Sequence, residues 1–215
     1  MYHSESQKIY NKLQQNLIHL TGKTVFIIGD IEIEVEGKDG LGGLIEEWFG
    51  VWAETQGFDI RNPKKEGASQ EFPDYFVGQN NGLLEVKAFD SSASANFDIA
   101  NFESYCETVA SNPQRVNSDY LIFSYSLSGS KLAIQNVWLK KIWEITCPSE
   151  RWPIKTQTKR DIIYNIRPAA WYSAHARFNV FDSKEDFINA LYETQEKYNG
   201  DNLKEAYLTH KNKED

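Results

Sequence analysis

The sequence predicts an α/β domain in which a central mixed β-sheet is flanked by helices. Two observations lead to this prediction. Short apolar or alternating runs of strand length recur along the chain, and segments with apolar residues at helical spacing lie between them. With 215 residues, the chain is long enough for one well-buried core and short of two. We therefore expect a single domain over residues 1–215.

The first third of the chain predicts a helix, a strand pair, a second helix and a short strand. These elements are expected over residues 6–20, 24–28, 31–35, 41–56 and 58–61. In the second strand, Ile31, Ile33 and Val35 alternate with glutamates. Because alternate side chains point to opposite faces of a strand, we expect these three apolar side chains to face the core and the glutamates to face water.

A β-hairpin is predicted over residues 72–87. Two apolar strands flank a turn rich in Gly and Asn at residues 79–82. Side chains two apart on a strand project from the same face, so Glu85 and Lys87 point together. The turn brings Asp74, at the start of the first strand, back beside that pair. Two carboxylates and an ammonium group then share one position on otherwise apolar strands.

Such a charge cluster is costly to hold unless something compensates it. A divalent metal is the obvious compensation, and hard oxygen ligands suit Mg²⁺, which takes one or two protein carboxylates together with water and phosphate oxygens. Lys87 would then hold the attacking water or help to deprotonate it, and the metal would stabilise charge on the phosphate. The arrangement indicates phosphodiester hydrolysis.

The same residues carry a family resemblance. Pro73-Asp74 followed by Glu85-Val86-Lys87 resembles the PD-(D/E)xK nuclease motif, and the whole chain is similar to a small type II restriction endonuclease, specifically to the NgoBV-like group. The resemblance implies a restriction-endonuclease-like fold, metal binding by Asp74 and Glu85, and a part in water activation for Lys87. An exposed hairpin with an incidental surface ion pair is the plainer alternative.

In many nucleases of the resembled family, a glutamate from a helix before the motif joins the metal site. Glu46 and Glu47 are the candidates in the helix predicted over residues 41–56. We favour Glu46, because Ile45 and Phe49 flank it on the face turned to the sheet. A solvated acid or a favourable charge near the helix N-terminus remains the alternative for each residue.

The rest of the chain predicts further strands and helices. We expect helices over residues 97–110 and 140–145, strands over 120–125, 131–139, 162–166 and 178–181, a loop over 154–160, a last helix after Ser183, and a frayed end over 204–215. The strands over 120–125 and 131–139 are expected to extend the sheet that holds the motif. Ser183 is the expected N-cap residue of the last helix.

The charge distribution qualifies the net charge of −8, which by itself argues against a nucleic-acid partner. Residues 138–177 contain eight basic and three acidic residues, an excess of five positive charges that leaves −13 for the remainder. The candidate DNA-binding residues are Lys64, Lys65, Ser91, Asn96, Lys155, Gln157, Lys159, Arg160 and Arg167. The alternatives are ordinary surface lysines for Lys64 and Lys65, a loop that caps the following helix for Ser91 and Asn96, and a merely exposed basic loop for residues 154–160.

Composition excludes several other classes of protein. No apolar run approaches the roughly 20 residues that cross a bilayer, and the polar start is no signal peptide, so we expect a cytoplasmic protein without a membrane partner. Cys106 and Cys147 form no zinc or disulfide pattern and are expected to be buried thiols. No pair of the 4 histidines has metal-site spacing.

Taken with the resemblance, the residues predict a Mg²⁺-dependent type II restriction endonuclease that cuts double-stranded DNA at a specific site. A homodimer is expected, because a palindromic site matches the two-fold symmetry of a dimer. One alternative is a structure-specific or repair nuclease of the same superfamily, although residues 88–215 exceed what cutting alone needs. The other is a DNA-binding module with a vestigial motif, which the intact Asp74, Glu85 and Lys87 disfavour.

Overall fold

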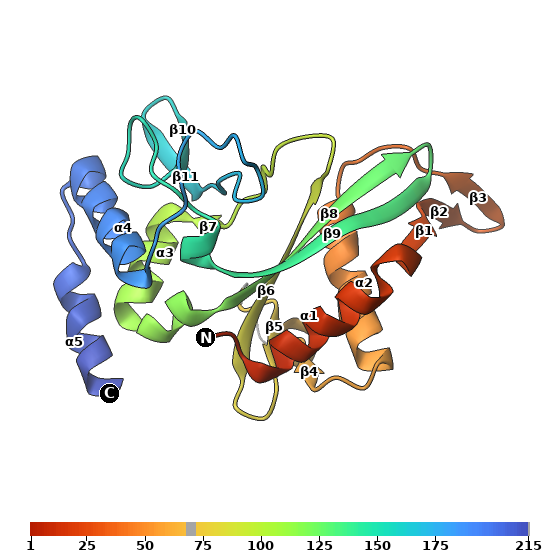
Figure 1. The fold of residues 1–215 in the computed structure, drawn as a ribbon, viewed down its shortest axis with the longest axis horizontal. Helices are drawn as coiled ribbons and strands as arrows, with labels where there is room; N and C mark the ends of the chain where they lie inside the picture. Colours follow the sequence, from red (N-terminus) through yellow and green to blue (C-terminus); the bar gives the residue numbers. More distant parts are fainter. Residues whose placement is uncertain (68–71, 215) are drawn as a thin grey trace. The chain divides into compact units, whose positions relative to one another are not determined.

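The structure is a computed structural model that describes residues 1–67 and 72–214. The chain forms two compact units, which Figure 1 draws as ribbons. The first contains Met1–Ser94 and Asp119–Lys140, and the second contains Ala95–Ser118 and Lys141–Asp215. Whether residues 1–215 act as a single domain stays a prediction. Among the described residues, no helix combines the length and the apolar character needed to cross a membrane.

The first unit contains two helices that pack on a sheet, and a separate two-stranded ribbon. Its elements are α1 (Ser4–Asn16), β1 (Thr21–Lys23), β2 (Val25–Ile28), β3 (Ile31–Glu34), α2 (Leu41–Thr55), β4 (Ile60–Arg61), β5 (Tyr75–Val77), β6 (Gly82–Asp90), β8 (Asp119–Ser128) and β9 (Lys131–Lys141). The helix predicted over residues 6–20 ends earlier than expected, and a 3₁₀ turn follows it over Leu17–His19.

The sheet of the first unit is mixed, as the sequence predicts. Its strand order is β1-β9-β8-β6-β5-β4. Strand β5 pairs antiparallel with β6, whereas β6 pairs in parallel with β8, with Lys87 opposite Ile122. Strands β8 and β9 extend the sheet that holds the motif hairpin, which confirms the prediction for those two segments.

One hydrophobic core joins both helices of this unit to the sheet. Helix α1 contributes Ile9 and Leu13, and α2 contributes Ile45 and Phe49, all of them buried. The sheet supplies apolar side chains of β5, β6, β8 and β9 to the same core. Because most helix stability comes from packing an apolar face, this core fixes where α2 lies against the motif strands.

The β2–β3 ribbon corrects one prediction. Both strands form as expected and pair antiparallel, but Ile31 and Ile33 do not face the core. Their exposed fractions are 69% and 53%, and Val35 beyond the strand is only half-buried. Alternation of apolar and polar residues fixes which side chains share a face, but it does not supply a surface for that face to pack on.

The second unit packs helices around a small sheet. Its elements are β7 (Ala100–Asn101), α3 (Phe102–Ser111), β10 (Thr156–Lys159), β11 (Ile162–Ile166), α4 (Lys184–Asn199) and α5 (Lys204–Glu214). The strand order is β10-β11-β7. Ser183 caps α4 by accepting a hydrogen bond from the Asp186 amide, as predicted.

Four segments in this part of the chain differ from the sequence predictions. Helix α3 starts at Phe102 rather than at residue 97, because Ala100 and Asn101 pair with β11 and the Asn101 side chain caps the helix. The segment expected as a loop contains β10, which forms a hairpin with β11. No strand forms over residues 178–181, and a 3₁₀ turn over Ile142–Glu144 replaces the short helix expected over 140–145.

The C-terminal segment also differs, because residues expected to fray form α5. Tyr207 is buried, and the Nδ1 atom of His210 lies 2.9 Å from the Ala110 carbonyl oxygen of α3. Asp215 lies outside the described residues. Cys106 and Cys147 are buried free thiols, as predicted, and burial raises the pKa of Cys106 to about 12.

Candidate active site

The β5–β6 hairpin positions the three motif side chains as the sequence predicts. Tyr75 pairs with Leu84 across the two strands. Leu84 and Val86 are buried in the core shared with α1 and α2, so Glu85 and Lys87 project from the opposite face of the sheet. Asp74 immediately precedes β5 and lies level with Glu85.

The N-terminus packs on the turn of this hairpin. A β-carbon at Gly78 or Gly82 would lie 2.6 Å from the His3 ring, so a larger residue at either position would displace that ring. The His3 amide donates to Asp119 Oδ2 at 2.9 Å, which ties the segment to the start of β8. The turn is therefore held against the first residues of the chain.

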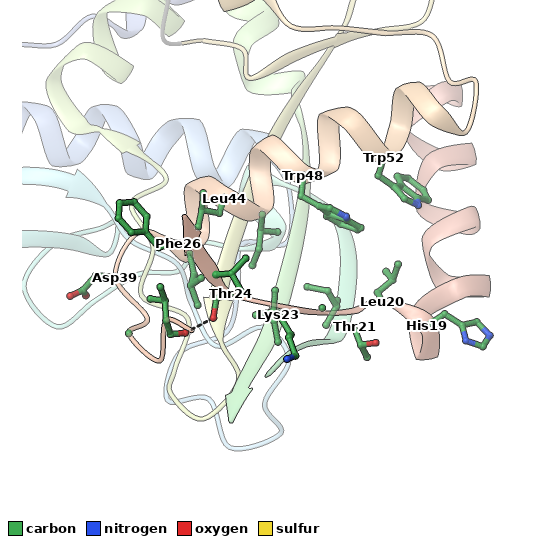
Figure 2. A pocket seen from close by; sticks show the side chains of 18 residues that line it. His19, Leu20, Thr21, Lys23, Thr24, Phe26, Asp39, Leu44, Trp48 and Trp52 are labelled. Carbon is green, nitrogen blue, oxygen red and sulfur yellow. Dashed lines mark hydrogen bonds between the residues drawn. The ribbon is translucent and has the colours of Figure 1, made fainter. Parts of the chain in front are cut away.

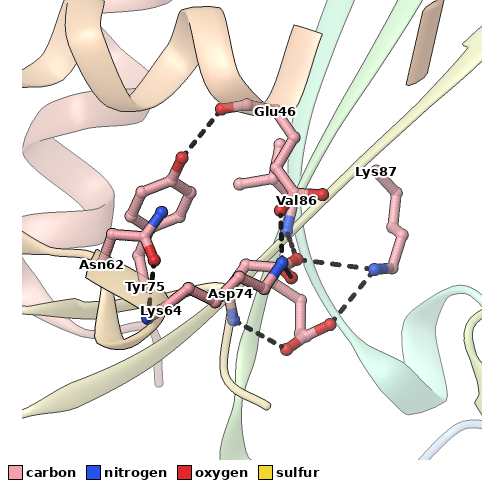
Figure 3. A network of polar contacts seen from close by, with 8 residues as sticks. Glu46, Asn62, Lys64, Asp74, Tyr75, Val86 and Lys87 are labelled. Carbon is pink, nitrogen blue, oxygen red and sulfur yellow. Dashed lines mark hydrogen bonds and ion pairs between the residues drawn. The ribbon is translucent and has the colours of Figure 1, made fainter. Parts of the chain in front are cut away.

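The Lys87 ammonium group contacts the side chains of both Asp74 and Glu85, and Figure 3 shows Lys87 facing Asp74. Lys87 Nζ lies 3.2 Å from Glu85 Oε2 and 3.5 Å from Asp74 Oδ2. Backbone amides also bind both carboxylates. Val86 N–H donates to Asp74 Oδ2 at 2.9 Å, and Asp74 N–H donates to Glu85 Oε1 at 3.2 Å. The backbone of the two strands thus orients both acids, and the catalytic roles of all three residues stay a prediction.

Burial makes this a highly charged site in a poorly solvated position. Asp74 and Glu85 are 4% and 5% exposed. Burial, supported by the Asp74 carboxylate and opposed by Lys87, raises the pKa of Glu85 to about 7. Burial also works against the charged form of Lys87, but Glu85 and Asp74 outweigh it and raise the pKa of Lys87. Lys87 is therefore an ammonium group at neutral pH.

Helix α2 brings Glu46, rather than Glu47, to the edge of this cluster. Glu46 is half-buried and Glu47 is exposed. The Tyr75 hydroxyl donates to the backbone carbonyl of Glu46 at 2.9 Å, which fixes this turn of the helix to β5. Burial and the neighbouring Asp74 raise the pKa of Glu46, and Lys64 partly offsets them.

Lys64 also belongs to this cluster, whereas the sequence predicted only that it lies near bound phosphate. Its Nζ atom lies 3.2 Å from Glu46 Oε1 and 4.0 Å from Asp74 Oδ1. The Asn62 side chain accepts a hydrogen bond from the Lys64 amide at 2.9 Å and starts a 3₁₀ turn over Pro63–Glu66. The Asn62-Pro63 pair is a sequence signal for this turn, but not for the direction of Lys64.

The cluster fits a metal ion that takes few protein ligands. Within residues 1–67 and 72–214, no group of three or more His, Cys, Asp or Glu side chains is arranged to hold a metal. Mg²⁺ requires less, because one or two carboxylates with water and phosphate oxygens suffice. Burial is the main cause of the raised pKa values of Glu85 and Glu46, and a divalent cation bound by Asp74 and Glu85 would favour the charged carboxylates.

Two further DNA-binding candidates lie in the first unit. The Lys65 ammonium is 3.8 Å from the Glu54 carboxylate, and both side chains are exposed. Ser91 follows β6 directly and is exposed, and its amide donates to the Tyr125 carbonyl at 2.7 Å. Ser91 therefore lies just beyond the strand that carries Glu85 and Lys87.

The other candidates lie in the second unit, where the β10–β11 hairpin carries several of them. Lys159 and Arg160 are exposed at the hairpin turn, and Arg160 has a positive φ of 50°. The Gln157 side chain accepts a hydrogen bond from Asn165 across the hairpin at 3.1 Å.

Three candidates of this unit make contacts that hold the chain together. Lys155 Nζ donates to the Pro168 carbonyl at 2.8 Å. Arg167 donates to the Asn96 carbonyl and lies 2.9 Å from the Asp98 carboxylate. These contacts give Lys155 and Arg167 structural roles, and DNA contact by any of the candidates stays a prediction.

Comparison with known proteins agrees with the motif. The sequence model of the NgoBV restriction endonuclease family matches residues 3–213. The type II restriction enzyme NlaIV of Neisseria lactamica is 36% identical over 198 residues, which cover 88% of this chain and 79% of NlaIV. The type II restriction enzyme NgoBV of Neisseria gonorrhoeae is 32% identical over 162 residues, which cover 72% of this chain and 90% of NgoBV.

Comparison with solved structures supports the same family. The solved structure of the NlaIV restriction endonuclease superposes with a TM-score of 0.86 at 32% identity, over 97% of this chain and 89% of that one. The predicted fold class and the predicted resemblance to NgoBV-like type II restriction enzymes are thus confirmed. The chain belongs to the NgoBV restriction endonuclease family and is a type II restriction endonuclease, a site-specific deoxyribonuclease.

Proposed function

We propose that this restriction endonuclease hydrolyses phosphodiester bonds of double-stranded DNA with Mg²⁺ at the cluster of Asp74, Glu85 and Lys87. The single observation that carries the proposal is the contact of the half-buried Lys87 ammonium group with the two buried carboxylates of the β5–β6 hairpin. Type II restriction endonucleases typically use a divalent metal ion. Mg²⁺ fits because two carboxylates are enough for it.

Asp74 and Glu85 are the residues that would hold the metal. Their oxygens are oriented by the backbone amides of Asp74, just before β5, and of Val86 in β6, so little ordering remains to be done when DNA binds. When bound, Mg²⁺ supplies positive charge beside the scissile phosphate and lowers the pKa of nearby water. Glu46 completes the acidic side of the site, with Lys64 next to it.

Lys87 acts as a proton donor in hydrogen bonds rather than as a base. Because the neighbouring carboxylates raise its pKa, its ammonium group does not accept a proton at neutral pH. It orients the attacking water or stabilises the developing negative charge on the phosphate. Of the two roles that the sequence left open, holding the water is the one that this charge state supports.

DNA binding is assigned to side chains in both units. The proposed contacts come from Lys64, Lys65, Ser91, Asn96, Lys155, Gln157, Lys159, Arg160 and Arg167. Lys159 and Arg160 are the strongest candidates, because they are exposed at the tip of a hairpin in the basic part of the chain. We also propose a homodimer, which matches a palindromic site, and a location in the cytoplasm, where the DNA substrate lies.

Plasmid cleavage tests the proposal. Purified protein with Mg²⁺ should cut plasmid DNA into discrete bands, and Asp74→Ala should abolish cleavage while leaving DNA binding in Ca²⁺ intact, because base contacts lie elsewhere. A smear would point to a nuclease without site specificity. Intact DNA at every metal concentration would overturn the proposal, and cleavage by Asp74→Ala within about tenfold of wild type would overturn the site.

A matched pair of variants tests the part assigned to helix α2. Glu46→Gln should lower the cleavage rate at least tenfold, since it removes a carboxylate next to Asp74. Glu47→Gln is the control, because the next side chain points about 100° away around the helix and is exposed. Equal effects of the two substitutions would limit the site to Asp74, Glu85 and Lys87.

A further inference from the structure

The β2–β3 ribbon of the first unit has one face made entirely of exposed apolar side chains. Its register pairs Phe26 with Ile33 and Ile28 with Ile31, and residues directly opposite each other share a face. The exposed fractions of these four side chains are 52%, 53%, 67% and 69%. A two-stranded ribbon is marginal by itself in water, so this face calls for a covering surface.

The same surface continues over helix α2. Leu44, Trp48 and Val51 lie at helical spacing and are 61%, 37% and 54% exposed. Between this helix and the chain from β1 to β2 lies a cavity of about 610 Å³, which Figure 2 shows. Its lining is mostly apolar and includes Leu20, Phe26, Leu44, Trp48, Trp52 and Leu132. We call the ribbon, the exposed face of α2 and this cavity the apolar surface.

The area of the apolar surface is that of one half of a protein interface. The seven exposed side chains of this surface amount to about four fully exposed large ones. At roughly 150–200 Å² each, they present about 600–800 Å². The largest apolar patch of a typical monomer is about 300–600 Å², whereas a stable interface buries about 800 Å² on each partner.

The charges beside this surface disfavour DNA or an anionic membrane as the occupant. Asp30, Glu32 and Glu34 lie in the ribbon itself. Lys23 is 2.9 Å from Glu34 and is engaged by it. Glu32 and Glu34 lie on the opposite face of the ribbon, and their charge would repel a polyanion that approached the apolar face.

We propose that the apolar surface is the dimer interface, and that its occupant is a second copy of this chain. The surface holds both an extended apolar ribbon and a neighbouring apolar cavity, so a two-fold axis lets the ribbon of each protomer cover the cavity of the other. This inference rests on the homodimer of the proposed function and names its contact surface. The same helix presents Leu44 and Trp48 to the partner and Glu46 to the active site, so pairing also fixes the helix that borders the cluster.

Sedimentation velocity over a range of protein concentrations tests the interface. Wild type should be a dimer, and Ile28→Asp, Ile31→Asp and Leu44→Asp should each raise the dissociation constant by about 100-fold, since each places a charge in an apolar contact. All three side chains are more than half exposed in the single chain, so the monomer should keep its circular dichroism and melting behaviour. Leu208→Asp on α5, at a side chain that is 43% exposed, is the matched control and should leave the dimer unchanged.

The possible failures are distinguishable. A monomeric wild type at all concentrations would overturn the homodimer and this interface together. A wild-type dimer whose dissociation constant is unchanged in the three variants would overturn the interface alone. Hydrogen exchange of wild type gives an independent check, because amides of residues 25–34 should gain protection as the protein concentration rises through the dissociation constant. Equal exchange below and above it would also overturn the assignment.

Discussion

Glu85 affects the stability of the protein as well as the proposed chemistry, because its side chain is buried beside Asp74. Burial raises its pKa from 4.5 to about 7. Between these values the unfolded chain has released the proton and the folded protein still holds it. The folded state binds more protons, so the free energy of unfolding falls as pH rises from about 4.5 to 7 and then levels off.

This contribution gives a pH-dependent prediction. Glu85→Gln, which cannot ionise, should lack the decline, so wild type should lose stability relative to the variant by on the order of 1 kcal/mol per pH unit over that window. Urea unfolding at pH 5, 6, 7 and 8 measures it, with the exposed Glu47→Gln as control. Parallel stability curves for wild type and Glu85→Gln would show that Glu85 titrates normally.

We expect both the charge and the shape of the Lys87 side chain to contribute to cleavage. Lys87→Ala should lower the single-turnover cleavage rate at least about 100-fold, since it removes the only ammonium group within 3.5 Å of both motif carboxylates in the described chain. Lys87→Arg should recover only part of the loss, because a planar guanidinium does not replace a compact ammonium between two carboxylates. Gel shifts in Ca²⁺ should show nearly unchanged DNA affinity. An arginine variant as fast as wild type would mean that charge alone matters.

At the scale of elements, helix α2 is the part that connects the core, the active site and the apolar surface. Ile45 and Phe49 pack in the core, Glu46 borders the cluster, and Trp48 lines the cavity. Close approach to β5 depends on Gly50, where a β-carbon would lie 2.5 Å from the Tyr75 hydroxyl. That hydroxyl is bonded to the Glu46 carbonyl, so the contact also sets the position of Glu46.

Gly50→Ala should therefore destabilise the protein by about 1–3 kcal/mol and slow cleavage, although alanine favours a helix. Gly43→Ala in the same helix is the control, because no atom lies within 4 Å of a β-carbon there, and it should be neutral or stabilising. Adding Tyr75→Phe to Gly50→Ala should restore part of the lost stability by removing the hydroxyl. Melting temperatures and cleavage rates of the four proteins measure this, and a Gly50→Ala variant as stable as Gly43→Ala would contradict it.

At the scale of the whole molecule, an acidic protein has to bind a polyanion. The net charge is −8, while residues 138–177 carry an excess of five positive charges. Most of this segment belongs to the second unit, where Lys159 and Arg160 are exposed on the β10–β11 hairpin. Each phosphate neutralised by such a side chain releases counterions, so affinity depends on salt.

Lys159→Ala and Arg160→Asn should weaken DNA binding, and each should make the slope of log affinity against log salt shallower by about 0.9 if the residue contacts a phosphate. Asparagine is used at position 160 because it tolerates the positive φ found there. A base contact would instead relax discrimination at one position of the site, at about 1–3 kcal/mol. Lys197→Ala on α4 is the control. Unchanged binding of both variants at every salt concentration would remove this hairpin from the DNA interface.

The sequence by itself determined the features that depend on neighbours along the chain. Alternation on a strand placed Glu85 and Lys87 on one face, and a turn of Gly and Asn returned Asp74 to them, so the cluster was predictable from residues 72–87. The strands β8 and β9 and the cap at Ser183 were predictable for the same reason. Turn chemistry, alternation and capping act over a few residues and need no knowledge of the fold.

Only the tertiary structure decided which surfaces these elements meet. It placed Lys64 in the cluster, left Ile31 and Ile33 exposed where alternation predicted burial, and formed α5 where the charged end of the chain predicted fraying. It also put Glu46, not Glu47, beside Asp74. The physical reason is common to all of these cases: a side chain's pattern fixes the face it shares, but burial and contact depend on a partner surface distant in sequence.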